Sequence, residues 1–448
     1  MTAGAGERPG GRVIAVGRHL ARIAAVLGGA GILLTACSSA PAAVSGMSGV
    51  KGSLEIAVFN PFSGADASYG PLMMSGCFPA VRLINKDGGI YGHDLTCTPV
   101  DTRGDPADAV PAANKLVATA SNLVMVIGPS SDEAAATVPI LNAAKIPMFP
   151  DAGDAEFDKS SFTYLWRLIP PDAADGYAQA IWAHDKGYTR AALIYASNVG
   201  FSNGPSGATA GFPALGGKIV YSATLTPDQP TYESTITAML ATNPQVILYE
   251  AGPRTSTTFF SELKSLGHLI PTIGPETIYE PQWEKAVSGV IGTSTLAKTV
   301  TIVEAFVNTA SAGWPTFHSA LLASASQIPQ ASTYANDPFT IANYDAVNMV
   351  ALAMLEKKTI DRSVLNATLS SIITAGSGKT VCDTFASCKS DILAGKQIQY
   401  VGASGPIQLN QWHNAGGNYH VITDALVPTS LGEITAGQVA ALIGKGKG

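Results

Sequence analysis

The chain has 448 residues, with 27 basic and 33 acidic side chains and a formal net charge of −6 at neutral pH. This length exceeds the usual size of one hydrophobic core, so two domains are expected. The acidic balance argues against nucleic acid as a partner, because a phosphate backbone attracts basic surfaces.

Residues 1–36 have the pattern of an export signal. They carry four arginines and one glutamate, then the apolar stretch 23–34, and they lead into Leu34-Thr35-Ala36-Cys37. A basic head and a short apolar core are typical of a signal peptide, and this core is shorter than the roughly 20 residues that span a bilayer. The ending resembles a bacterial lipobox, in which Cys37 becomes the lipidated first residue. The alternative is an ordinary signal with a chance cysteine.

Residues 37–52 are rich in serine, alanine and glycine, which predicts a flexible tether. Without residues 1–36 the chain keeps 23 basic and 32 acidic side chains, a formal net charge of −9. No later apolar run reaches spanning length. The lipid would therefore be the anchor that holds the protein on the extracytoplasmic side of the membrane, in the cell envelope.

Four cysteines remain besides Cys37, and an even number in an exported chain predicts disulfides. Four cysteines allow three pairings, and we expect Cys77–Cys97 and Cys382–Cys388 because each pair is close in sequence. The alternative is four buried free thiols. No Cys-x-x-Cys spacing or other metal-binding pattern is present, so neither a metal nor a cofactor is expected.

From residue 53 the chain alternates short strand-like runs with helical patterns. Strands are expected over 54–59, 95–101, 123–127 and 146–149, with helices over 71–86, 106–120 and 132–144 between them. This alternation predicts an α/β fold with a parallel sheet covered by helices.

A second series of the same kind follows residue 169. Asp172 is expected to cap a helix whose apolar stripe includes Tyr177 and Trp182 and which ends at Gly187. Strands are expected over 191–196, 219–225 and 246–249, and the next helix ends at Gly267. Two such series predict two doubly wound parallel-sheet lobes.

The last third of the chain is more helical. Helices are expected over 339–357 and 361–374, followed by a hairpin over 399–422 that turns at 414–417. This region fits neither series, which indicates that the chain crosses back between the lobes.

Several short segments along the chain form an ordered set of motifs. They are Asn60-Pro61-Phe62-Ser63-Gly64 with Tyr69-Gly70, then 86–92, Asp101 with Pro106, 127–131, 344–347, and Gly405-Pro406-Ile407. In this order they resemble the type I periplasmic binding proteins, specifically the leucine/isoleucine/valine-binding receptors of ABC importers. The resemblance runs over nearly the whole chain that follows the tether.

The resemblance implies two lobes joined by three crossovers that close on a ligand in the cleft between them. We expect the first lobe over 53–168 and 295–376, and the second over 169–294 and 377–448. The implied function is that of an ABC-importer substrate-binding protein for a small polar solute such as an amino acid or amide. ABC permease subunits are the implied partners, and no enzymatic activity is implied.

Ser130 and Ser131 end a strand and open a helix, where free N–H groups and the helix dipole attract an anion. The alternative is an ordinary N-cap. By resemblance, either serine holds an amino-acid carboxylate, Asp151-Ala152-Gly153 gives further contacts, and Tyr69 belongs to the first binding loop. In the second lobe, Gly274-Pro275-Glu276 matches the segment whose glutamate binds the ligand's ammonium group.

Three positions depart from the family pattern. Gly153 stands where members commonly have threonine, Phe201-Ser202 where the second lobe usually has Tyr-Gly, and a glycine close to Glu250 where a tyrosine is expected. Phe201 and Glu250 are therefore also ligand-binding candidates. Asp151, Glu250 and Glu276 together make the cleft more acidic than an aliphatic amino acid requires. The alternative for Asp151 and Glu250 is that they are solvated loop carboxylates.

Two other classes of function are weighed. Residues 200–204 match the Gly-x-Ser-x-Gly motif of serine hydrolases, with Ser202 as the nucleophile. That motif needs a strand that runs directly into the turn, whereas three residues intervene here. The other class is a sensory module of the same fold that presents its ligand to a receptor or kinase. The chain encodes no signalling domain, so this function would need a separate partner.

Overall fold

The computed structural model describes residues 46–445 except 48, 65–66, 68, 120, 198–203, 279–280, 306 and 425–427. The expected signal peptide, the expected lipidation site Cys37, and the candidates Phe201 and Ser202 lie outside the described residues. Among the helices that are described, none is long and apolar enough to cross a membrane.

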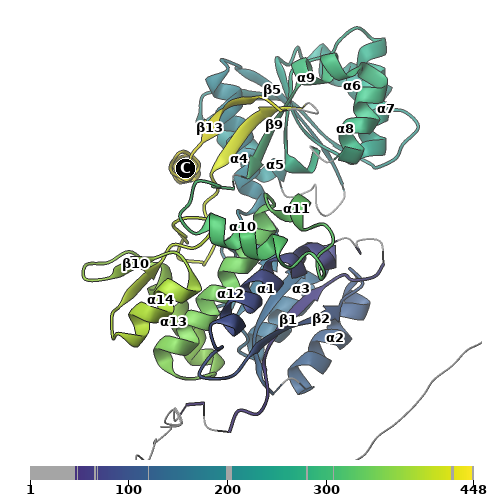
Figure 1. The fold of residues 1–448 in the computed structure, drawn as a ribbon. Coiled ribbons are helices and arrows are strands. Elements are labelled where there is room, and N and C mark those ends of the chain that lie inside the picture. The colour runs from purple at the N-terminus through teal and green to yellow at the C-terminus, as the bar shows by residue number, and fades with distance from the viewer. Residues whose placement is uncertain are drawn as a thin grey trace, which may run out of the picture. The chain divides into compact units, whose positions relative to one another are not determined.

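The first lobe is built on a parallel sheet with the strand order β2-β1-β3-β4 (Figure 1). Apolar residues of β1 and β3 pack against α1 on one face of this sheet and against α2 and α3 on the other. The doubly wound arrangement expected from the first series is therefore confirmed. Its elements are β1 (Leu54–Asn60), α1 (Tyr69–Lys86), β2 (Leu95–Asp101), α2 (Pro106–Thr119), β3 (Leu123–Ser130), α3 (Ser131–Ala143) and β4 (Met148–Asp151).

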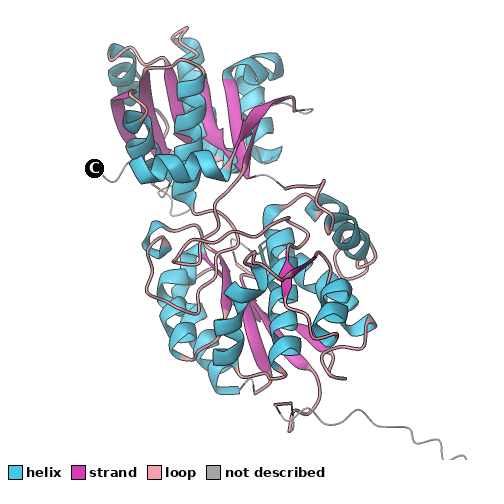
Figure 2. Ribbon diagram, turned by 90° about the vertical axis from the view of Figure 1, so that its left-hand side faces the viewer, coloured by secondary structure: helices cyan, strands magenta, loops and turns pink. Residues whose placement is uncertain are grey.

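The second lobe is built on a seven-stranded sheet with the order β13-β12-β9-β8-β7-β5-β6. Helices α4, α5 and α15 cover one face, and α7 and α8 cover the other (Figure 2). Its elements are α4 (Asp172–Asp185), β5 (Arg190–Ala196), α5 (Gly204–Ala214), β6 (Lys218–Leu225), α6 (Glu233–Ala241), β7 (Val246–Glu250), α7 (Pro253–Ser265), β8 (Thr272–Pro275), η3 (Glu276–Ile278), α8 (Pro281–Ile291), α9 (Thr293–Thr299), β9 (Val300–Ala305), β12 (Tyr419–Thr423), β13 (Ser430–Ile434) and α15 (Ala436–Lys445).

The chain then returns to the first lobe, where α12 is buried along almost its whole length against α1. Cys382 and Tyr400 belong to the same core, while β9 belongs to the second sheet. Both returns thus come later than the boundaries of 295 and 377 that we expected. The elements are α10 (Trp314–Leu322), α11 (Ala331–Tyr334), α12 (Pro338–Lys357), α13 (Arg362–Ile373), β10 (Thr380–Cys382), α14 (Phe385–Leu393) and β11 (Ile398–Tyr400).

The hairpin expected over 399–422 is wrong. Strand β11 pairs in parallel with β10, whereas β12 pairs with β9 and β13 in the other sheet. Residues 401–418 between them form a connection between the lobes, in which the Asn-Ala-Gly-Gly sequence resembles a hairpin turn. A second expectation also changes, because Pro171 is the N-cap of α4 and Asp172 is its first helical residue.

Three connections join the lobes: residues 152–171, the segment between β9 and α10, and residues 401–418. The first and third lie side by side. The Arg167 N–H donates to His413 O at 2.9 Å, and Arg167 Nε donates to Asn414 Oδ1 at 2.7 Å. The rings of Trp166 and His413 stack with centroids 3.7 Å apart.

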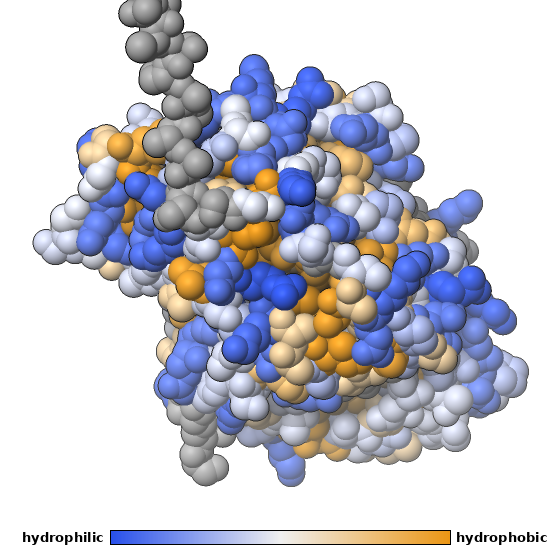
Figure 3. Space-filling model, turned by 90° about the horizontal axis from the view of Figure 1, so that it is seen from below, coloured by the Kyte–Doolittle hydropathy of each residue, from blue (hydrophilic) through white to orange (hydrophobic). Residues whose placement is uncertain are grey.

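Both expected disulfides are present, Cys77–Cys97 between α1 and β2, and Cys382–Cys388 between β10 and α14. The four cysteines within the described residues are therefore paired, as expected for an exported chain. Figure 3 views the first lobe from below and shows exposed apolar side chains interspersed with hydrophilic ones. Such exposure is common on folded proteins.

Candidate functional site

The candidate residues lie where the parallel strands of each sheet end. Ser130 ends β3, Asp151 ends β4, and the two are partners in the strand register. Glu250 ends β7, and Glu276 follows β8 directly. The carboxyl ends of parallel strands form the usual ligand-binding edge of such a sheet. The sequence therefore pointed to equivalent edges in both lobes.

At the edge of the first lobe, the N-terminus of α3 already has an internal anion. Ser130 is the N-cap, and it forms a capping box with Glu133, whose Oε1 accepts from the Ser130 N–H at 3.4 Å. Glu133 is fully buried, and this burial raises the pKa of its carboxyl. Ser131 is the first residue of the helix and is partly buried. The carboxyl group of Glu133 thus already occupies part of the N-terminal end of α3, where a ligand anion could bind.

Asp151 lies beside this helix end. Both of its carboxylate oxygens are shielded from solvent, and neither has a partner at hydrogen-bond distance and angle among the described residues. Burial raises the pKa of the Asp151 carboxyl well above its usual range. Repulsion from Glu133 and Asp337 acts in the same direction, whereas the backbone of Asp151 and the side chain of Asn60 act against it. Asp151 is therefore not the solvated loop carboxylate that we kept as an alternative.

Gly153 is required by a close approach of Asp172, which begins α4 in the second lobe. An ideal Cβ on Gly153 would lie 1.5 Å from Asp172 Oδ1, and the Asp172 N–H donates to Gly153 O at 2.9 Å. Any side chain at position 153 would displace this carboxylate. Because position 153 is a glycine, Asp172 can lie at the candidate site. From the sequence alone, Asp172 was expected only as a helix cap.

Glu250 is buried at the end of β7, with only 4% of its surface exposed. Its Oε1 accepts from Thr277 Oγ1 at 2.6 Å, and its Oε2 lies 3.1 Å from an ideal Cβ on Gly204, the first residue of α5. Burial raises the pKa of Glu250 to about 8, with added repulsion from Asp172 and Glu276. Glu250, like Asp151, is therefore not a solvated loop carboxylate.

Glu276 is partly buried and accepts from the Ala305 N–H at 3.3 Å through Oε2. Burial raises the pKa of Glu276 to about 7, and repulsion from Glu304 and Asp337 adds to the shift. Asp337 is the N-cap of α12 in the first lobe, and burial raises its pKa to about 6 although the Thr340 N–H donates to it at 2.9 Å. The charges of the two lobes therefore interact with one another.

Asp175 completes this group in the first turn of α4. Burial raises the pKa of its carboxyl well above the usual range, followed by repulsion from Glu276, Asp172 and Glu250. The buried Tyr419 of β12 lies beside it. We call the seven residues that surround the two strand edges the carboxyl cluster: Glu133, Asp151, Asp172, Asp175, Glu250, Glu276 and Asp337.

Sequence reasoning identified Asp151, Glu250 and Glu276 but not the other members of the carboxyl cluster. Asp172, Asp175 and Asp337 stand at helix starts, where acidic residues are common for capping reasons alone. In the described part of the chain, no group of three or more His, Cys, Asp or Glu side chains is placed to hold a metal ion.

Tyr69 is the first residue of α1 and is 40% exposed. The loop before it is fixed by Asp101, which accepts from the Phe62 N–H at 2.9 Å and the Ser63 N–H at 3.1 Å. This loop follows β1, which ends at the same edge of the first sheet as β3. Tyr69 is a more exposed candidate than the carboxyl residues.

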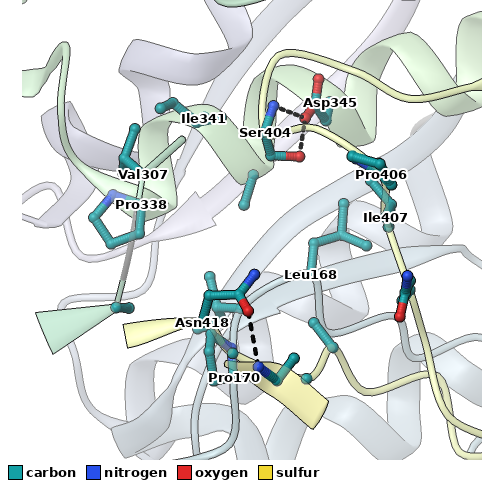
Figure 4. A pocket seen from close by; sticks show the side chains of 18 of the residues that line it. Leu168, Pro170, Val307, Pro338, Ile341, Asp345, Ser404, Pro406, Ile407 and Asn418 are labelled. Carbon is teal, nitrogen blue, oxygen red and sulfur yellow. Dashed lines mark hydrogen bonds between the residues drawn. The ribbon is translucent and has the colours of Figure 1, made fainter. Parts of the chain in front are cut away.

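A pocket of about 410 Å³ lies at the three connections (Figure 4). Its walls combine polar groups with apolar side chains, among them Leu168 of the first connection, Val307 of the second and Ile407 of the third. Its labelled polar groups are engaged: Ser404 Oγ donates to Asp345 at 2.6 Å, and Asn418 Oδ1 accepts from the Ala436 N–H at 2.8 Å. None of the predicted ligand-binding residues lines this pocket.

Comparison with known proteins gives matches over most of the chain. A family model described as periplasmic binding protein matches residues 53–382. The leucine-, isoleucine-, valine-, threonine- and alanine-binding protein of Pseudomonas aeruginosa is 30% identical over 123 residues, which are 28% of this chain and 33% of that protein. The alignment thus spans about a third of the length of such curated relatives.

Solved structures extend the likeness in fold. A leucine-binding protein from Thermotoga maritima has a TM-score of 0.64 at 15% identity, and the match covers 85% of this chain and 99% of that one. A solute-binding protein of an ABC transporter from R. palustris, solved with benzoate, has a TM-score of 0.62 at 18% identity and covers 85% and 96%. Because these two ligands differ, the shared fold does not define the solute.

Proposed function

Because the chain belongs to the periplasmic binding protein family, we propose that it is the extracytoplasmic substrate-binding protein of an ABC importer. It binds a small polar solute between its two lobes and delivers it to permease subunits. The proposed solute class is an amino acid, an amide or a related compound, which the named relatives support. Binding and release complete this function without a catalytic step.

The observation that carries the proposal is the meeting of two strand edges from different sheets. The two edges meet where the Asp172 N–H of the second lobe donates to Gly153 O of the first at 2.9 Å. Loops at the ends of two doubly wound sheets can enclose a solute when the lobes close. Ligand contacts that differ between the open and closed states would drive this closure.

Glu276 is the proposed partner of a cationic nitrogen on the solute. Its carboxylate is partly exposed and receives one backbone hydrogen bond, from the Ala305 N–H. A carboxylate that is held in place and partly desolvated pairs well with an ammonium group. Ser131 and the first N–H groups of α3 are the proposed partners of an anionic or hydrogen-bond-accepting end.

A thermal-shift screen tests the function, with amino acids, amides, amines and small organic acids as the probes. A bound solute stabilises the folded state by mass action and raises the melting temperature. Each hit is then measured by small-angle X-ray scattering, where closure decreases the radius of gyration. If no solute both stabilises and compacts the protein, the binding function is excluded.

Attachment to the membrane through Cys37 is part of the proposal. Cys37→Ala should move the protein from the membrane fraction to the soluble fraction, because lipid chains supply the anchoring energy. Fractionation followed by immunoblotting measures this shift, with Ser39→Ala as a control in the tether that keeps the lipidation site. Retention of the Cys37 variant in the membrane fraction would exclude lipid anchoring.

A further inference from the structure

The first connection between the lobes contains a buried arginine. Arg167 is 0% exposed, and its guanidinium donates in four hydrogen bonds among the described residues. Nη1 donates to Ala152 O at 3.4 Å and to Asp154 O at 3.0 Å, and Nη2 donates to Asp158 Oδ1 at 2.5 Å. Nε donates to Asn414 Oδ1 at 2.7 Å. One side chain thus joins the start of the first connection to the third connection.

The amide of Asn414 completes this network from the third connection. Its Nδ2 donates to Asp158 O at 2.8 Å, so Asn414 contacts both the arginine and the loop that the arginine holds. The backbones are paired as well: the Arg167 N–H donates to His413 O, and the Ala415 N–H donates to Arg167 O, each at 2.9 Å. We call these groups the Arg167 network: Arg167, Asp158, Asn414 and the carbonyl groups of residues 152 and 154.

Separate movement of the two connections would disrupt the Arg167 network. It would break the bond to Asn414 or the bonds to residues 152–158. A buried guanidinium that loses an acceptor keeps its charge without a full set of partners, and such a state is strongly disfavoured. The first and third connections should therefore bend as one unit when the lobes move.

The network also reaches the candidate ligand site. Ala152 follows Asp151, which ends β4, and precedes Gly153, whose O accepts from the Asp172 N–H of the second lobe at 2.9 Å. Arg167 holds the carbonyl groups on either side of Gly153. The segment 151–153, which was predicted to contact the solute, is therefore fixed against the third connection and not by the first sheet alone.

We infer that Arg167 is a positioning residue for solute binding. It couples the segment 151–153 to the third connection, so that this segment and the hinge between the lobes move together. Arg167 acts through these groups and not by touching the solute, because its guanidinium is buried and engaged by the protein itself. This inference rests on the proposed binding function and adds to it a residue that was not among the sequence-predicted candidates.

Hydrogen exchange of the empty full-length protein tests the coupling without a solute. Asn414→Leu removes the acceptor of Arg167 Nε and the donor to Asp158 O. Amide exchange should become about tenfold faster over both 152–158 and 410–415, because each segment loses the support of the other. Faster exchange in 410–415 alone, or in neither segment, overturns the inference.

Asn85→Leu is the matched control. The Asn85 amide also accepts one hydrogen bond and donates another, at 2.8 and 2.9 Å, but both partners are backbone groups of Leu95 within the first lobe. This variant loses stability for the same physical reason. Its exchange over 152–158 and 410–415 should nevertheless stay within about twofold of wild type, since the Arg167 network is intact. Equal effects of the two variants would mean general destabilisation and would overturn the inference.

Calorimetric titration tests the positioning role, with the amino acid or amide that gives the largest shift in the thermal-shift screen as the probe. Affinity should fall about tenfold in Asn414→Leu and change less than about twofold in Asn85→Leu. Normal affinity in an Asn414→Leu protein with faster exchange overturns the positioning role. If no solute binds the wild type, the proposed function and the positioning role fail together, whereas the exchange result still decides whether the connections are coupled. Asn414→Ser, with Asn85→Ser as its control, gives the same tests if Asn414→Leu does not fold.

Discussion

Asp345 and the carboxyl cluster are both buried acidic groups, but the donors around them differ. Asp345 in α12 accepts from the Tyr400 hydroxyl at 2.7 Å, the Ala403 N–H at 2.8 Å, and the Ser404 N–H and hydroxyl at 2.9 and 2.6 Å. Glu250 of the cluster accepts from Thr277 Oγ1 at 2.6 Å and is repelled by Asp172.

The difference separates a structural acid from acids that we propose to be available to a ligand. At Asp345, both oxygens are occupied and the bonds fix residues 400–404, which begin the third connection between the lobes. A fully satisfied buried network makes a structure rigid. A carboxyl group with spare acceptor capacity destabilises the empty protein, and this cost is recovered when a cation binds.

The largest expected effect is loss of stability in Asp345→Ala. The change leaves the Tyr400 hydroxyl, the Ala403 N–H and two donors of Ser404 without an acceptor. We expect the free energy of unfolding to fall by about 3–5 kcal/mol. Urea denaturation followed by circular dichroism measures it. A stable variant that has lost only solute binding would place Asp345 in the ligand site instead.

Glu276→Ala should have the opposite profile. Solute binding should weaken by about 2–5 kcal/mol, because a desolvated ligand cation loses its partner. Stability of the empty protein should stay constant or rise, since repulsion from Glu304 and Asp337 is relieved. Calorimetry, scattering and urea denaturation together test this contrast, with Glu233→Ala as the control. Normal affinity and normal compaction in the variant would remove Glu276 from the site.

The pH dependence of stability sharpens the comparison further. Burial raises the pKa of Glu250 to about 8 and that of Glu276 to about 7, so the folded state retains protons that the unfolded chain releases near pH 4.5. The free energy of unfolding of the empty protein should therefore fall as the pH rises from about 4.5 to 8. His413 acts in the opposite direction, because burial lowers its pKa and the unfolded chain binds its proton first.

The difference between wild type and Glu250→Gln isolates the effect of the cluster from that of His413. Urea denaturation at pH 5, 6, 7 and 8 should show a smaller decline for the variant. Solute affinity in the wild type should rise over the same range, because a cation prefers ionised carboxylates. Parallel stability profiles for the two proteins would mean that Glu250 does not titrate in this range.

The alternation of strands and helices was predictable because it depends on local periodicity. The strand over 95–101 matches β2 residue for residue, and Asp361, the expected first residue of its helix, is the N-cap of α13. The connection over 401–418 was not predictable in this way. Its turn sequence was compatible with a hairpin between β11 and β12. The structure excludes this hairpin, because β11 pairs with β10 whereas β12 pairs with β9.

The candidate site was predictable only in part, because its charge is a tertiary property. Glu250 and Glu276 were found from strand ends and from the family resemblance. Asp172 was not, since its importance comes from the missing Cβ of Gly153, almost 20 residues earlier in the chain. Close packing of α5 on α4 contributes as well: an ideal Cβ on Gly207 would lie 1.8 Å from Ala173 O, next to Asp172. No local pattern encodes such an approach.

The smallest expected effect belongs to Ser131→Ala, at the edge of the first lobe. If the Ser131 hydroxyl and the N–H groups of α3 hold a solute carboxylate, the variant should bind an amino acid found in the thermal-shift screen about 1 kcal/mol more weakly, because backbone donors remain. Binding of an amine found in the same screen, which has no carboxylate, should not change. Ser130→Ala is the matched comparison: it removes the N-cap of the capping box with Glu133, so it should lower stability by about 1 kcal/mol. Equal losses for both solutes in Ser131→Ala would mean that the serine supports the helix rather than the ligand. Unchanged affinity for the amino acid would mean that Ser131 does not bind the carboxylate. The start of α3 would then have a structural role, as Asp345 does.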